Sequence, residues 1–181
     1  MTFETKPVFL IVFPLFSWFT GCFEQVADVA NPKGYDSHQL SFQYPRNWQI
    51  SEDTFTPQVH NLFVESPGDA LVIIQCYNSG TTQDLKAFSE SFSENARTET
   101  PLGEFSDSNF RTLSKEAGYD WIQEEFEISL LGESIPHKRI FGTKKINNRQ
   151  VLLIFQVAIE DYLKAEPGLN LIRDTLGPSP E

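Results

Sequence analysis

The chain has 181 residues, of which 40% are hydrophobic and 22% are charged, a composition that suits one globular domain with an N-terminal addition. Its 14 Lys and Arg residues stand against 25 Asp and Glu residues, which gives a formal net charge of −11. A surface of this sign is repelled by nucleic-acid phosphates and by anionic lipid head groups. We therefore expect no nucleic-acid partner.

An apolar segment opens the chain and ends close to a cysteine. No charged side chain occurs between Lys6 and Glu24, which leaves 17 residues, the lower limit for a transmembrane helix. Pro14 lies in the middle of this run. Three alternatives are an exported signal sequence, an uncleaved anchor and a buried core helix. The first is favoured, because a signal needs only a short apolar core and a core helix would show a polar face.

The end of the apolar segment carries a motif. Phe19, Thr20, Gly21 and Cys22 resemble the lipobox of bacterial lipoproteins, in which a small residue precedes a cysteine that is diacylated before cleavage. Thr20 and Gly21 fit this pattern, whereas Phe19 stands where an aliphatic residue is usual. The resemblance implies a lipoprotein signal peptide over residues 1–21 and a lipidated Cys22, with acyl chains such as palmitate as the anchor.

The same resemblance implies a location. A lipidated Cys22 would hold the protein on the periplasmic side of the bacterial cell envelope. Phe23 follows the cysteine where an Asp would favour retention in the inner membrane. The outer membrane is therefore the weak preference.

A polar segment follows the cysteine. Residues 23–39 contain Pro32 and Gly34 and show no sustained period, which is typical of a linker. We expect residues 22–39 to be the lipidated cysteine and a flexible tether, averaging ~20–25 Å from end to end. A single domain over residues 40–177 and a short tail over residues 178–181 complete the predicted organisation.

Alternation of apolar and polar residues predicts strands, and a spacing of three and four predicts helices. The apolar run at 69–78 is nearly continuous and indicates a central strand. Thr81 or Thr82 is placed to cap the first helix. The predicted strands are 40–45, 47–50, 60–66, 69–78, 104–115, 119–130, 135–146 and 150–160, and the predicted helices are 81–96 and 169–176.

The turn between the last two strands predicts their register. Asn147 and Asn148 tolerate positive φ and suit a two-residue hairpin. Ile140 would then face Phe155 on one side of the sheet, and Phe141 would face Ile154 on the other. Because both faces are apolar, each needs a cover. The sequence therefore predicts an α+β fold with an antiparallel β-sheet sandwiched between helices.

The opening of the domain carries a further resemblance. The stretch LSFQYPRNWQI contains an aromatic-x-Tyr-Pro-x-x-Trp element formed by Phe42, Tyr44, Pro45 and Trp48. With the order of elements that follows, it resembles the PsbP-like superfamily over residues 38–177, which includes lumenal PsbP proteins, DcrB-type lipoproteins and chaperones of some type VI secretion effectors. The resemblance implies a non-enzymatic accessory, assembly or chaperone role and transfers no catalytic residue.

Glu124, Glu125 and Glu127 form a carboxylate cluster that is a candidate cation site. Glu125 and Glu127 share a strand face, but they lie ~6.6 Å apart along the strand. No loop rich in Asp, Asn and Gly lies beside the three carboxylates to arrange the oxygen ligands that a calcium ion needs. We expect a solvated face in which Glu127 lies opposite Arg139 as a cross-strand pair.

The histidines and the remaining cysteine do not indicate a metal site, a redox site or a catalytic nucleophile. His38, His60 and His137 are scattered, with no second His or Cys at ligand spacing. Cys76 reads as a small buried hydrophobe and has no disulfide partner once Cys22 is acylated. We therefore expect no catalytic residue, no metal, no cofactor and no enzyme.

Tyr119 and Trp121 are the aromatic residues with two open interpretations. The inward face of their strand is predicted to carry Ile122, Phe126 and other apolar residues, which leaves Tyr119 and Trp121 on the opposite face. There they either pack beneath the second helix or form an exposed patch for a partner.

Two classes of function remain. The first is a membrane-tethered, non-enzymatic binding, assembly or chaperone-like module with the membrane and an envelope protein as partners. The second is a small-molecule binder or an enzyme of the envelope, which would need a deep pocket with convergent polar groups.

Overall fold

The fold is taken from a computed structural model that describes residues 24–78, 80, 82–99, 104–106, 108–130 and 132–180. The predicted signal peptide at 1–21 and the predicted lipidation residue Cys22 lie outside the described residues. No helix in the described ranges is long and apolar enough to cross a membrane.

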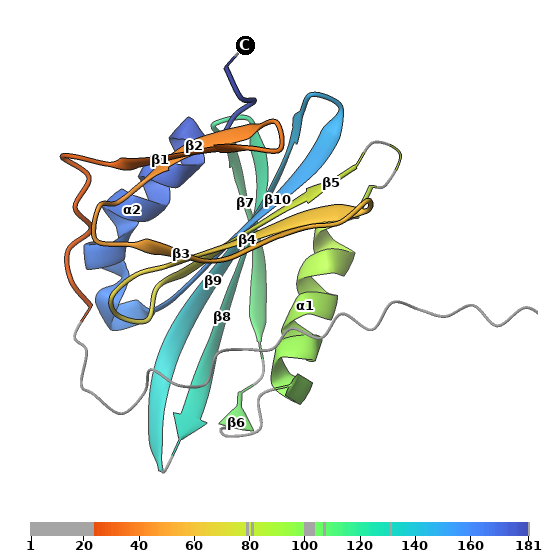
Figure 1. The fold of residues 1–181 in the computed structure, drawn as a ribbon. Coiled ribbons are helices and arrows are strands. Elements are labelled where there is room, and N and C mark those ends of the chain that lie inside the picture. Colours follow the sequence, from red (N-terminus) through yellow and green to blue (C-terminus); the bar gives the residue numbers. More distant parts are fainter. Residues whose placement is uncertain are drawn as a thin grey trace, which may run out of the picture.

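An eight-stranded antiparallel sheet forms the body of the molecule (Figure 1). The strand order is β3-β4-β5-β10-β9-β8-β6, and β7 also pairs with β8. β5 lies between two neighbours, as its apolar run predicts. The strands are β3 (Gln49–Phe55), β4 (Val59–Glu65), β5 (Leu71–Tyr77), β6 (Glu104–Phe105), β7 (Asn109–Glu116), β8 (Tyr119–Leu130), β9 (Glu133–Ile146) and β10 (Arg149–Ala158).

The hairpin of β9 and β10 has the predicted register. Asn147 and Asn148 have φ values of 48° and 61°, the left-handed conformation that a two-residue hairpin needs. Phe155 pairs with Ile140, and Ile154 pairs with Phe141. Alternate residues of β10 consequently enter two different apolar clusters.

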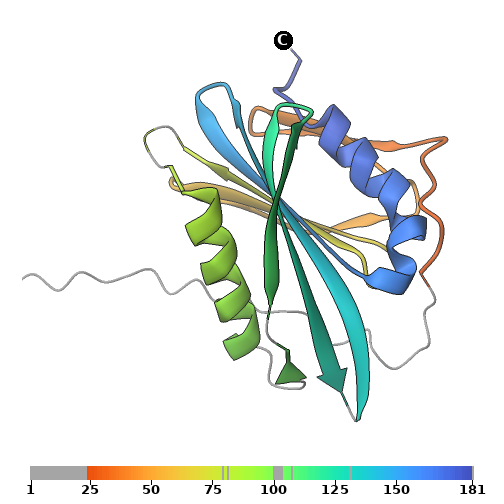
Figure 2. The same cartoon turned by 180° about the vertical axis from the view of Figure 1, so that it is seen from behind.

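One cluster contains α2 (Tyr162–Thr175), which follows a short 3-10 turn, η1 (Ile159–Asp161), and the other contains α1 (Leu85–Glu99). Leu153 and Phe155 of β10 belong to the first cluster, and Leu152 and Ile154 belong to the second. Figure 2 shows α2 beside the hairpin of β1 and β2, and α1 beside β6 and β7. The prediction of an antiparallel sheet with two helices is confirmed.

Both helices begin at different residues from those predicted. The Ala87 N–H donates to Asp84 Oδ1 at 2.9 Å, so Asp84, rather than a threonine, caps the first turn of α1. α2 begins at Tyr162 and continues through Pro167. The Glu-Pro-Gly sequence suggests a break there, but Ala165 and Gly168 on either side are buried, and this packing keeps the segment helical.

A separate two-stranded hairpin is formed by β1 (Lys33–Ser37) and β2 (Leu40–Tyr44). The Tyr35 ring stacks on that of Phe42 with centroids 4.9 Å apart. At the turn, His38 and Gln39 have φ values of 49° and 64°. Arg149 donates to the carbonyls of both turn residues, at 3.2 and 3.1 Å.

The ordered domain extends beyond the predicted boundaries at both ends. The Ala27 N–H donates to the Lys164 carbonyl at 3.0 Å, and the Ser179 N–H donates to the Gln39 carbonyl at 3.4 Å. The prediction of a flexible tether is therefore wrong for residues 24–39, and residue 179 of the predicted tail also contacts the fold. Both segments are polar, and their partners lie too far away in the sequence to be recognised from local composition.

Candidate functional site

The first described residue, Glu24, is held in a polar site at one end of the sheet. Its Oε2 accepts hydrogen bonds from Ser66 Oγ at 2.6 Å and from the N–H groups of Asp69 and Ala70 at 3.0 and 3.2 Å. These donors come from the loop between β4 and β5. A Cβ atom at Gly68 would collide with Glu24, so the loop sequence is matched to the bound carboxylate.

A second acidic group lies in the same loop. Asp69 Oδ2 accepts the Ala158 N–H at 2.7 Å, and His137 Nε2 lies 3.8 Å from this oxygen. Burial raises the pKa of Asp69 to about 6, and the nearby charge of Glu24 acts in the same direction. Burial lowers the pKa of His137. The end of the sheet therefore joins the N-terminal segment, the β4–β5 loop and the end of β10.

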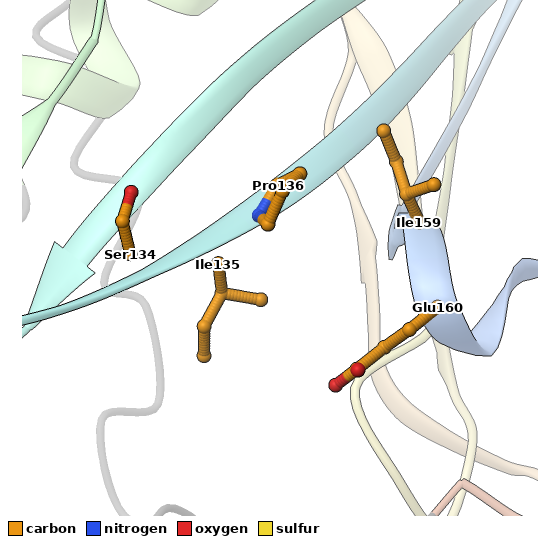
Figure 3. Close-up of a pocket in the computed structure, with 5 residues that line it drawn as sticks. All are labelled: Ser134, Ile135, Pro136, Ile159 and Glu160. Atoms are coloured by element: carbon orange, nitrogen blue, oxygen red, sulfur yellow. The ribbon is translucent and has the colours of Figure 1, made fainter.

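Apolar side chains are exposed beside this polar site. Val26 and Leu163 directly precede Ala27 and Lys164, the residues that are hydrogen-bonded through their backbones. A hollow of about 310 Å³ lies between β9 and η1 (Figure 3). It is lined by Ser134, Ile135, Pro136, Ile159 and Glu160.

Sequence analysis misplaced the partner of Arg139. The structure pairs Arg139 with Glu124, whereas Glu127 lies opposite Pro136. Arg139 Nη1 donates to Glu124 Oε2 at 2.8 Å, and both side chains are buried. The predicted turn was centred too late in the sequence, because Leu130 pairs with Glu133. The register therefore differs by three residues, and Arg139 faces Glu124, which lies on the opposite face of β8 from Glu127.

Polar and aromatic groups enclose this ion pair. Gln156 Oε1 accepts from Arg139 Nε and Nη2 at 2.9 and 2.6 Å, and Ser93 and Ser108 donate to Glu124 Oε1. Burial lowers the pKa of Arg139 to about 10, against the opposing effect of Glu124, so the guanidinium stays charged at neutral pH. Its Cζ lies 4.6–6.0 Å from the ring centroids of Phe92, Phe126 and Phe141.

The other two carboxylates of the cluster are exposed, as predicted. Glu127 Oε2 accepts from Ser134 Oγ at 2.6 Å, and Glu125 Oε1 accepts from Gln123 Nε2 at 2.6 Å. Across the described ranges, no group of three or more His, Cys, Asp or Glu side chains is arranged to hold a metal ion.

The structure brings together two of the three histidines. The rings of His38 and His60 lie 4.9 Å apart, and His38 stacks on Phe55 at 4.2 Å. Asp53 Oδ1 lies 2.7 Å from His60 Nε2, and Tyr35 donates to Asp53 Oδ2 at 2.9 Å. Burial lowers the pKa of His60. This cluster was missed because residues 51–54 are all polar and show no alternation, so that their continuation of β3 could not be recognised as a strand.

Cys76 is fully buried in β5, as predicted. Burial raises the pKa of its thiol. A thiol that is both enclosed and held in its neutral form is neither a ready nucleophile nor a ready metal ligand.

Tyr119 and Trp121 are buried in the cluster that contains α2. Their rings stack at 4.6 Å, and Trp121 Nε1 donates to the Glu116 carbonyl at 3.1 Å. Trp121 pairs across the sheet with Gly142, where a Cβ atom would overlap the indole. The interpretation of these side chains as an exposed aromatic patch is therefore wrong. They pack in the cluster beneath α2, which was the other interpretation. Gly142 inside an apolar strand was the available signal, because such a glycine marks a close approach.

Comparisons with known proteins identify the fold. No family model and no curated protein matches the chain. The solution structure of PsbP from the cyanobacterium Synechocystis sp. PCC 6803 is 10% identical, covers 82% of this chain and 92% of its own, and has a TM-score of 0.53. LpqN of Mycobacterium tuberculosis, described as involved in cell envelope biogenesis, is 12% identical over 83% of this chain and 90% of its own, with a TM-score of only 0.43. The PsbP-like fold predicted from the sequence is confirmed.

Proposed function

We propose that this chain with a PsbP-like fold is a lipoprotein of the bacterial cell envelope, anchored through an acylated Cys22. It faces the periplasm, with the outer membrane preferred over the inner membrane. Its domain, a sheet sandwiched between helices, acts as a non-enzymatic binding, assembly or chaperone-like module. The membrane is one partner, and an envelope protein is the other.

The observation that carries this proposal is the position of the lipobox-like motif next to the fold. Gly21 and Cys22 directly precede a segment whose first described residue, Glu24, is bound by the β4–β5 loop. Cleavage before Cys22 would thus remove the apolar run and keep every described residue. An acylated cysteine at this point supplies the anchor that the run supplied before cleavage.

The non-enzymatic part of the proposal is supported by where the reactive groups lie. Glu124 and Arg139 are bonded to each other and buried, and Cys76 is buried as well. Groups enclosed in this way cannot touch a substrate without local opening of the fold. They stabilise the domain instead.

Replacement of Cys22 tests the anchor. We expect Cys22→Ser to abolish incorporation of labelled palmitate, to leave the apolar segment uncleaved and to change the mass of the protein accordingly. The matched control is Cys76→Ala, which removes the other cysteine and should keep both acylation and cleavage. Unchanged mass, processing and membrane association in Cys22→Ser would show that the lipoprotein assignment is wrong.

The accessory role needs a separate test. The acylated protein, captured from detergent-solubilised membranes, should retain a specific envelope protein at a reproducible ratio. Failure to retain any envelope protein after chemical cross-linking would count heavily against the module.

A further inference from the structure

We propose that the exposed apolar surface around the docked N-terminal segment is a membrane-contact surface, which seats the domain directly on the bilayer. This inference rests on the proposed acylation of Cys22. The surface, called the N-terminal patch below, consists of Val26, Val29, Ile159 and Leu163.

Exposure sets these four residues apart. Among the described residues, five large hydrophobic side chains are exposed, and four of them form the N-terminal patch. Leu163 is 77% exposed and Val26 is 67% exposed, followed by Ile159 at 42% and Val29 at 39%. Single exposed hydrophobic residues are ordinary, but a concentration at one end of a domain indicates an interaction surface.

A backbone contact places Val26 beside the segment that carries Ile159 and Leu163. The Ala27 N–H donates to the Lys164 carbonyl at 3.0 Å, which joins the segment of Val26 to the first turn of α2, where Leu163 lies. Figure 1 shows the described N-terminal segment beside this end of α2. Ile159 lies one helical turn before Leu163 and lines the hollow with Ile135 and Pro136 (Figure 3). The hollow therefore continues the apolar surface.

The path of the chain identifies the occupant. Glu24 is bound within the fold, and Cys22 precedes it by two residues, which span at most about 7 Å. Acyl chains on Cys22 must enter the bilayer within this distance of the fold. The N-terminal patch starts two residues after Glu24, so it lies at the end of the domain that is nearest to this entry point. The occupant is therefore the membrane that holds the anchor.

Charge favours zwitterionic lipid for this contact. Two lysines that contact the segment around Leu163 are already engaged: Lys164 pairs with Asp161 at 2.7 Å, and Lys138 lies 3.9 Å from the ring centroid of Tyr162. The whole chain carries a net charge of −11. Apolar contact, rather than attraction to anionic head groups, accordingly holds the patch at the surface.

A single probe can test the contact in the intact acylated protein. Cys76 is fully buried and Cys22 is acylated, so Leu163→Cys provides one reactive thiol for a fluorescent label. The labelled protein is inserted into phosphatidylcholine vesicles that contain lipids spin-labelled at a shallow acyl position. The matched control is Phe55→Cys, a large exposed hydrophobic position at the end of β3, where it pairs with His60 of β4. His60 lies about 20 Å along β4 from Ser66.

We expect the label at residue 163 to be quenched by the spin-labelled lipids at least three-fold more strongly than the label at residue 55. Equal quenching at the two positions, in protein shown by mass to be acylated and by flotation to be vesicle-bound, would overturn the membrane contact and leave the anchor intact. Absence of acyl chains on Cys22 would overturn both proposals.

A charged variant makes the test independent of the label. Val26→Asp combined with Ile159→Asp should reduce quenching of the residue-163 label several-fold while flotation is unchanged, because the acyl chains still hold the protein. Phe55→Asp is the control and should have no effect. Two outcomes would assign the patch to another occupant: burial of the label in a dimer that persists in detergent, or retention of residues 1–21 over the patch in the mature protein.

Discussion

Arg139 and Glu124 face each other across β8 and β9, with Nη1 donating to Oε2 at 2.8 Å and with exposed side-chain fractions of 1% and 0%. Removing one partner of such a pair leaves a buried charge without compensation, which costs far more than the pair itself contributes.

We expect Arg139→Met to lower the free energy of unfolding by about 3–5 kcal/mol. Combining it with Glu124→Leu should recover part of the loss, because both charges are then absent. Urea denaturation followed by tryptophan fluorescence gives the values. Lys115→Met is the matched control, since Lys115 forms an exposed pair with Asp120 at 2.7 Å and such pairs contribute about 0–1 kcal/mol. Equal losses in Arg139→Met and Lys115→Met would contradict the prediction.

The contact of Trp121 with Gly142 predicts a second effect. Gly142→Ala places a methyl group where the indole lies, so we expect a loss of about 1–3 kcal/mol from overpacking, with a shift in tryptophan emission. Gly34→Ala is the control, because its added Cβ atom would meet nothing within 4 Å. A stable Gly142→Ala protein with unchanged emission would refute this contact.

Because the β4–β5 loop binds Glu24, a substitution of Glu24 or of the loop residue Gly68 should loosen the N-terminal segment. Glu24→Ala leaves the Ser66 hydroxyl and the Asp69 N–H without their acceptor, a cost of about 1–3 kcal/mol, whereas the Ala70 N–H keeps Ser66 Oγ as an acceptor. Gly68→Ala blocks the same site sterically. In both variants, hydrogen exchange of the Ala27 amide should speed up. The exposed Gln25 supplies the control, Gln25→Ala, for which exchange should stay slow.

Asp69 predicts a pH dependence of stability. Its pKa is raised by burial from 3.8 to about 6, so the folded state holds the proton more tightly than the unfolded state. The contribution of Asp69 is therefore most favourable below about pH 4 and is lost as the pH rises to about 6.

In Asp69→Asn this titration is absent. The unfolding free energy of the parent, minus that of Asp69→Asn, should fall by on the order of 2 kcal/mol between pH 4 and 6.5 and then level off. Chemical denaturation at each pH measures this difference. The contributions of the other ionisable groups largely cancel, since these groups are present in both proteins. A flat difference would rule out the raised pKa.

The strained turn of the β1–β2 hairpin can be relieved by glycine. Gln39 has a φ of 64°, a conformation that costs a non-glycine residue roughly 1–2 kcal/mol. Gln39→Gly should raise stability by about 0.5–1 kcal/mol, allowing for the greater freedom of the unfolded chain. Thermal unfolding checks this, and Ser91→Gly on the exposed side of α1 should do the opposite.

Local sequence preferences predicted the parts of the fold that depend on neighbouring residues. Asn147 and Asn148 favour left-handed backbone, so the register of β9 and β10 followed from two residues. Gln39 has no such preference, and the turn that it forms with His38 is held by Arg149, more than a hundred residues away. This hairpin could not be predicted from its own sequence.

The candidate site depended even more on distant contacts. Glu24 appears as part of a polar linker until the loop that binds it is known. Glu124 appears as one of three solvated carboxylates until the β8–β9 register is known, because an odd shift reverses which side chains are buried. The lipobox-like motif stays a prediction, which the sequence alone can make because such a motif is short and contiguous.

The bound position of Glu24 also changes how often a tethered domain would meet its partners. A flexible linker of 17 residues would let every face of the domain sample the space near the membrane, with an effective concentration set by linker statistics. If Cys22 is acylated as proposed, its two-residue link to the bound Glu24 restricts the orientations of the domain instead. Under the proposed acylation, a partner in the same membrane meets only the sides of the domain, while a diffusing partner meets the far end, where His38, Phe55 and His60 lie.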